Sequence, residues 1–216
     1  MREHDWEPLP GLPERLPEGE RILWQGAPSW RLLARRAFHI RALAAYLGAL
    51  WLWLAVTTLT GGASGWHAAE MVGGNLVLAL VTLGLIALFC WLTQRSTAYT
   101  ITNHRLVIRF GIALPLTVNV PFAMIASAGV KADKVGRGDI ALSLLPARRI
   151  GYFVLWPHAR PWKLARTEPM LRALPDAVQV AQILSRALAA SAEQAAPPLP
   201  QAAAAEVQPG RATAAA

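Results

Sequence analysis

The sequence predicts an α+β membrane protein, in which a two-helix transmembrane hairpin is joined to a small antiparallel β-barrel or sheet closed by a C-terminal helix. Two long apolar segments, short runs of strand character after them, and one closing helical pattern predict this fold class. The composition fits, since 54% of the 216 residues are hydrophobic and 16% are charged. A typical soluble domain has about 25% charged residues.

The chain begins with an acidic segment, residues 1–19, that is rich in Pro and Gly and has no apolar core before a small-residue cleavage site. We therefore expect no signal peptide. Residues 20–39 follow as a first strand, ERILWQG, and a lead-in to the membrane. Because that strand resembles those after the hairpin, we expect the hairpin to interrupt one sheet after its first strand.

The transmembrane hairpin is predicted over residues 40–92, with spans at about 40–59 and 71–92. The first span carries one charge, Arg41 at its edge, and the second carries none. About 20 apolar helical residues cross a hydrocarbon core of about 30 Å. A buried helix pair in a soluble bundle would have a polar stripe at helical spacing, and neither segment has one. A multi-pass membrane protein is the prediction.

Loop charge predicts the orientation of this hairpin. The connecting loop TGGASGWHAAE has no Lys or Arg, whereas basic residues flank the outer ends of both spans. These flanking residues are Arg31, Arg35, Arg36, Arg41, Arg95 and Arg105. The positive-inside rule then places both termini in the cytoplasm.

Three residues of the first span are candidates for intramembrane packing. Trp51 and Trp53 lie near mid-bilayer rather than in an interfacial belt, so we expect them to pack against the second helix. The alternatives are another protein's helix or a pigment. Gly48 forms a small-x-x-x-small pair with Ala44 that would permit close helix approach.

Residues 95–190 are predicted to form a cytoplasmic domain of about seven short strands and one helix. The strands are expected at YTIT, RLVIRFG, LPLTVNVP, MIASAGV, IALSLL and YFVLW, with a further run at PARRIG. Asn103 and His104 form a tight turn, since Asn tolerates positive φ.

The helix is expected over residues 175–190 with Asp176 as its N-cap, and the Ala/Pro-rich tail 191–216 is expected to be disordered. Strands without helices between them favour a pleckstrin-homology-like fold over a doubly wound one.

The charge of the chain is concentrated in this domain, where residues 95–190 contain thirteen Lys or Arg and four Asp or Glu. An anionic lipid surface is the first partner that such a tethered domain meets, and an acidic protein is the alternative. Tethering to a membrane argues against nucleic acid. The candidate interaction residues are Arg105, Lys131, Lys134, Arg137, Arg148 and Arg149.

The sequence indicates no catalytic residues, metal site or cofactor, and we expect a protein that is not an enzyme. Its single cysteine, Cys90, lies in an apolar run, and its five histidines have no spacing suited to a metal. His39 and His67 are weak candidates for a bacteriochlorophyll magnesium, because neither lies within a span. No Gly-rich phosphate loop precedes a helix.

Three segments carry a resemblance to a known family: HDWEPLPGLPERLPEGERILWQGAPSWRLLARRAFHIR, YTITNHRLVIRFGIALPLTVNVPFAMI and GDIALSLLPARRIGYFVLWPHARPWKLARTEPMLRALPDAVQVAQIL. They resemble the PuhB family of photosynthetic complex assembly proteins, over about residues 4–190. The resemblance implies a bacterial pleckstrin-homology protein of the inner, intracytoplasmic membrane of a purple phototroph.

It also implies a role in assembling the photosynthetic reaction centre and its core light-harvesting complex. The implied partners are reaction-centre subunits, core-antenna polypeptides and other assembly proteins, and a homodimer is left open. The family has no catalytic residues to carry over. The alternative is a membrane-tethered pleckstrin-homology-like module that binds anionic lipid or a protein partner outside photosynthesis; a third reading, a pigment carrier, predicts a coloured protein.

Overall fold

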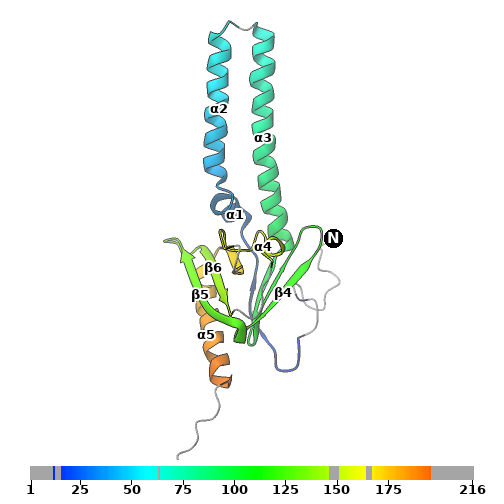
Figure 1. Cartoon of the computed structure of the whole chain (residues 1–216), viewed down its shortest axis with the longest axis vertical. Helices are drawn as coiled ribbons and strands as arrows, with labels where there is room; N and C mark the ends of the chain where they lie inside the picture. The colour runs from blue at the N-terminus through cyan, green and yellow to red at the C-terminus, as the bar shows by residue number, and fades with distance from the viewer. Residues whose placement is uncertain (1–11, 13–15, 63, 146–150, 164–166, 196–216) are drawn as a thin grey trace, which may run out of the picture.

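The computed structural model describes residues 12, 16–62, 64–145, 151–163 and 167–195, to which the structural statements below refer. Two long helices, α2 (Ile40–Thr60) and α3 (Gly65–Ser96), form a hairpin that projects from a strand-rich domain (Figure 1). Both are long and apolar enough to cross a membrane. Helix α3 extends beyond the expected span 71–92 at both ends. The span was predicted from apolar residues alone, whereas the helix also includes the more polar residues that flank them.

The first sheet contains β1 (Ile22–Gly26), β2 (Ala98–Thr102), β3 (Arg105–Phe110) and β4 (Leu116–Pro121), in that order and antiparallel throughout. Trp24 of β1 lies opposite Ile101 of β2, and Gly26 lies opposite Tyr99. The two paired strands are separated in sequence by the whole hairpin. The prediction that the hairpin interrupts a sheet after its first strand is therefore confirmed.

The turn between β2 and β3 occurs where it was expected, but its chemistry differs. Asn103 is not among the described residues with positive φ. Instead, Thr102 Oγ1 accepts hydrogen bonds from the N–H groups of His104 (3.2 Å) and Arg105 (3.0 Å). The Asn103 side chain accepts from the Arg21 N–H and donates to the Gly19 carbonyl, so it fastens the approach to β1.

The second sheet contains β5 (Ile125–Ala132), β6 (Gly138–Leu144) and β7 (Met170–Leu174), again antiparallel. A single turn of 3₁₀ helix, η1 (Phe122–Met124), connects β4 to β5. Of the two expected forms, an antiparallel barrel or sheet, the described residues show the sheet: the two sheets do not join into a closed barrel. Helix α5 (Ala177–Ala195) packs beside β5 and β6 (Figure 1) and also contacts η1 and β1.

Two further expectations need correction. The run YFVLW is not a strand but a short helix, α4 (Tyr152–Leu155), whose Leu155 side chain is fully buried. Short apolar runs do not distinguish a strand from a buried helical turn by periodicity. Strand β7 was not predicted, and α5 extends beyond residue 190. The expected run PARRIG and most of the tail lie largely outside the described residues.

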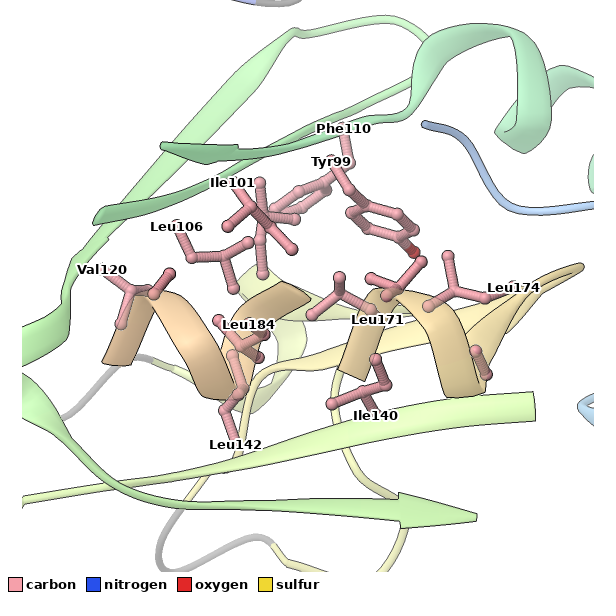
Figure 2. Close-up of a cluster of buried hydrophobic side chains, with 14 of the residues drawn as sticks. Tyr99, Ile101, Leu106, Phe110, Val120, Ile140, Leu142, Leu171, Leu174 and Leu184 are labelled. Atoms are coloured by element: carbon pink, nitrogen blue, oxygen red, sulfur yellow. The ribbon is translucent and has the colours of Figure 1, made fainter. Parts of the chain in front are cut away.

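The core lies between the two sheets and α5, as Figure 2 shows. Tyr99, Ile101 and Leu106 point inward from the first sheet, and Ile140 and Leu142 point toward them from the second. Leu184 of α5 fills the space between them. Each buried side chain of this size contributes about 1.5–3 kcal/mol. This core holds the two sheets and α5 together as the domain to which the hairpin is attached.

Candidate functional site

A second buried cluster joins the hairpin to the domain. Helix α1 (Trp30–Arg36) packs against α3 and β7, and its Leu33 is fully buried with Cys90 of α3 and Ala173 of β7. Ala173 has a φ of 53°, and its N–H donates to Asp139 Oδ1 (2.7 Å) while its carbonyl accepts from the Ser29 N–H (2.9 Å). Helix α1 is thus fastened to both the hairpin and the second sheet.

The other connection is direct, since only Thr97 separates α3 from β2. Thr97 Oγ1 lies 3.3 Å from His158 Nε2, and the Tyr99 hydroxyl lies 2.8 Å from His158 Nδ1. The Arg172 N–H donates to the Tyr99 oxygen (3.2 Å). All groups are satisfied if Tyr99 donates to Nδ1 and Nε2–H donates to Thr97.

Burial, reinforced by the charge of Arg172, lowers the pKa of His158 to about 3. The imidazole is therefore neutral at physiological pH, as this network of hydrogen bonds requires.

A cavity of about 840 Å³ lies where the end of α1 meets the second sheet, and we refer to it as the joint cavity. Its walls come from the end of α1 and the turn before α2, from β5, β6 and β7, and from the segment 152–162. Four of its described lining residues are Lys or Arg, namely Arg36, Lys131, Arg160 and Arg172, whereas Asp139 is the only acidic one. The joint cavity is therefore strongly basic.

Asp139 lies among these basic groups. Its Oδ2 is 3.8 Å from Nη1 of Arg36, and Lys131 is its partner across the β5–β6 pair. The Lys131 ammonium makes no hydrogen bond or ion pair with another described residue, although the backbone of Lys131 belongs to the β5–β6 ladder. Arg160 pairs with Glu168 at 2.7 Å. Burial of Glu168 opposes ionisation, but its bonds to Arg160 and Lys163 lower its pKa overall.

The basic residues predicted from sequence that the structure describes do not form one patch. Lys131 lines the joint cavity, Lys134 lies in the exposed turn after β5, and Arg137 pairs with Asp133 in that turn (3.1 Å). Arg148 and Arg149 lie outside the described residues.

Arg105 belongs to the domain's own packing. Its guanidinium contacts both carboxylate oxygens of Glu20 at 2.7 Å. Burial would raise the pKa of Glu20, but hydrogen bonds from Arg105 and Thr102 and the Arg105 charge lower it overall. The pair fastens the approach to β1 onto β3, so Arg105 is not an open interaction residue.

The three hairpin candidates also differ from one another. The Trp51 indole N–H donates to the Val72 carbonyl of α3 at 3.0 Å, within the hairpin. Trp53 is 73% exposed, so most of its surface is not covered by α3. A Cβ added at Gly48 would meet no atom within 4 Å, so Gly48 is not a point of close approach between α2 and α3.

Sequence reasoning missed the joint cavity because its residues come from separate elements. Arg36 was assigned only to loop charge, and Arg172 was not placed because β7 was not recognised. The signal for β7 was present, since MLRAL lies between Pro169 and Pro175. Within the described part of the chain, no group of three or more His, Cys, Asp or Glu side chains is arranged to hold a metal.

Comparison with known proteins adds two findings. A family described as the bacterial PH domain matches residues 38–188. A Rhodobacter capsulatus protein, named as an uncharacterized 23.7 kDa protein in the puhA 5′ region, is 41% identical over 192 residues. The alignment covers 87% of this chain and 89% of that relative. No solved structure matches the chain.

Proposed function

We propose that this chain, which belongs to the bacterial PH domain family, is a non-enzymatic assembly factor for the photosynthetic reaction centre and core light-harvesting complex. The observation that carries the proposal is the Rhodobacter capsulatus relative in the puhA 5′ region, which is similar over most of both chains. The resemblance of three sequence segments to the PuhB family supports the same role.

The proposal places α2 and α3 across the bacterial inner membrane, with both termini in the cytoplasm. Large apolar side chains such as Leu59, Leu78 and Trp53 are exposed along both helices, and such a surface is unfavourable in water. Phe38, Phe89 and Trp156 cluster at the base of the hairpin, with ring centroids 5.5–6.3 Å apart. Aromatic side chains at this level are typical of a membrane interface.

The two ends of α3 support the same placement. Trp66 is exposed near the start of α3, and Trp91 lies near its other end, next to the domain, where the Arg95 guanidinium is 4.7 Å from the Trp91 ring centroid. A Trp near each end of a span and a basic residue on the domain side are the features expected for this orientation.

In the proposed mechanism, the apolar surface of the hairpin contacts membrane subunits while the domain positions their cytoplasmic parts. The α1 cluster and the direct connection from α3 to β2 support this division, because they allow little independent movement of the two parts. Trp53 is the side chain of the predicted set that is free to contact another helix. Reaction-centre subunits, core-antenna polypeptides and other assembly proteins are the proposed partners.

Deletion of the gene in a phototrophic bacterium tests the proposal. We expect lower near-infrared absorbance from both reaction centre and core antenna in isolated membranes, restored by the full-length protein in trans. Unchanged absorbance and unchanged kinetics of complex formation after a shift to phototrophic growth would refute the assembly role.

The alternative function is a membrane-tethered module that binds anionic lipid or a protein partner outside photosynthesis. The basic lining of the joint cavity favours a lipid ligand within this alternative. It predicts binding of the full-length protein to anionic lipid together with normal photosynthetic complexes in the deletion strain.

A further inference from the structure

We infer that the joint cavity binds the phosphate group of an anionic membrane phospholipid, with Arg36, Lys131 and Arg172 as its cationic contacts. The inference rests on the membrane placement in the proposed function and adds a specific ligand site to it. It differs from a diffuse attraction between a basic surface and a bilayer, because it requires particular residues around one cavity.

Charge is unbalanced around the joint cavity. Among the described lining residues, four basic side chains share one lining carboxylate, that of Asp139, and of these four only Arg160 has a close carboxylate partner, Glu168, which does not line the cavity. Asp139 already accepts a hydrogen bond from the backbone of Ala173, and its nearest cationic nitrogen, on Arg36, is 3.8 Å away. An anion with several acceptor oxygens would satisfy the remaining donors. Phosphate is such an anion, and guanidinium groups bind it through paired hydrogen bonds.

The individual cations of the joint cavity have few anionic partners among the described residues. Nη1 of Arg172 donates to the Pro157 carbonyl at 2.9 Å, and no carboxylate of the described chain lies within ion-pair distance of its guanidinium. The Lys131 ammonium has no described polar partner, although Asp139 lies opposite Lys131 in the strand pair. Arg36 donates to the Arg137 carbonyl, which holds its side chain against the cavity wall. Three cations are thus held together without equal negative charge.

The joint cavity lies next to the start of the hairpin. Arg36, Ala37 and His39 form one wall of the joint cavity, and α2 begins at the next residue, Ile40. If α2 enters the bilayer there, the cavity lies at the level of the lipid headgroups. Trp162, which is 93% exposed, lies on the same cavity and has the amphipathic ring found at such interfaces. A volume of about 840 Å³ is within the roughly 300–1,000 Å³ usual for small-molecule sites.

The shared chemistry of the site is phosphate recognition, and its two sources are a lipid headgroup and free phosphate. The membrane-level position favours the lipid. A lipid can place its headgroup in the cavity while its acyl chains lie along the apolar surface of α2, whereas free phosphate gains nothing from that surface.

The test uses the full-length protein in a neutral detergent, titrated with phosphatidylglycerol or phosphatidylcholine and analysed by native mass spectrometry. The double variant Arg36→Gln/Lys131→Gln removes two cations of the joint cavity. The single variant Lys131→Gln is also measured. Its matched control is Lys134→Gln, which removes the same charge three residues away, on the exposed turn outside the cavity.

We expect saturable binding of one phosphatidylglycerol per chain and little binding of phosphatidylcholine. Affinity should fall at least about tenfold in Arg36→Gln/Lys131→Gln, given the usual strength of hydrogen bonds to charged groups, and by less than about twofold in Lys134→Gln. Equal affinity in the wild type and the double variant would overturn the inference. An equal loss in Lys131→Gln and Lys134→Gln would overturn it too, because it would indicate diffuse electrostatics.

Competition separates the two ligand sources. We expect inorganic phosphate to displace phosphatidylglycerol only at far higher concentration than a second anionic phospholipid does. Displacement at similar concentrations would assign the site to free phosphate and overturn the lipid assignment. The gene deletion distinguishes this inference from the proposed function: normal complexes in the deletion strain refute the assembly role, whereas absent lipid binding in a protein that restores the complexes refutes only the lipid site.

Discussion

The strand-rich domain should not fold without the strand that precedes the hairpin. A fragment that begins after α3, residues 97–195, contains six of the seven described strands but lacks β1. A second protein, in which residues 16–26 are joined to residues 98–195 by an Asn-Gly turn, restores β1 while omitting α1 and the hairpin. Gly26 and Tyr99 are paired neighbours in the sheet, so a tight turn of this kind can connect the two strands.

The contribution of β1 can be worked from its contacts. The Glu20 side chain is 3% exposed and forms a two-point ion pair with Arg105, for which about 2 kcal/mol is typical. Trp24 packs against the core, at about 2 kcal/mol. The Gln25 to Thr100 hydrogen bond and the β1–β2 ladder add about 1 kcal/mol for each bond. The total approaches the 5–15 kcal/mol by which whole domains are stable.

The assay compares the two proteins by size-exclusion chromatography, near-ultraviolet circular dichroism and thermal denaturation. We expect the joined protein to be monodisperse with a cooperative transition, and the fragment 97–195 to aggregate or to lack fixed tertiary signal. Glu20→Gln in the joined protein should lower its midpoint without abolishing folding. A fragment 97–195 that unfolds at the same temperature as the joined protein would refute the reasoning.

Three further predictions concern the contacts between the hairpin and the domain, and the contacts within the hairpin. In each case the stability of the full-length protein is measured by thermal denaturation in detergent. The pKa of His158 is lowered to about 3 in the folded protein. As the pH falls below about 6.5, His158 is therefore protonated in the unfolded chain but stays neutral in the folded one. Stability should then fall by about 1.4 kcal/mol per pH unit, and His158→Gln should remove this slope between pH 6.5 and 5. Leu33→Ala should cost about 2–5 kcal/mol, whereas Arg35→Ala on the exposed face of α1 should cost little; equal effects would contradict the buried joint. Trp51→Phe should cost about 1 kcal/mol through loss of the bond to Val72, and a larger effect of Trp53→Phe would reverse the assignment of their roles.

Local pattern was sufficient for much of the fold. The two apolar segments had no alternative to long helices, and the strand character of ERILWQG predicted that β1 joins the sheet across the hairpin. The turn at Asn103 was predicted in place but for a different reason, because Thr102 caps the turn and Asn103 bonds to the segment before β1. Turn position follows from composition, whereas the hydrogen-bond partners depend on a segment more than 80 residues away.

The joint cavity could not be predicted in the same way. Arg36, Lys131 and Arg172 belong to a helix and to two strands of the second sheet, and no local spacing connects them. Counting charge over the domain identified a basic surface, but could not separate Lys131 at the cavity from Arg105 in its ion pair with Glu20. Side-chain pairing decides which basic residues are available, and pairing depends on tertiary structure.

The assembly role is tested most directly by affinity purification of the full-length protein from membranes at intervals after a shift to phototrophic growth. If the protein acts transiently in assembly, reaction-centre and core-antenna subunits should co-purify early, in substoichiometric amounts, and decline as mature complexes accumulate. Absence of these subunits at every time point would contradict the assembly role, as would a constant one-to-one ratio in mature complexes.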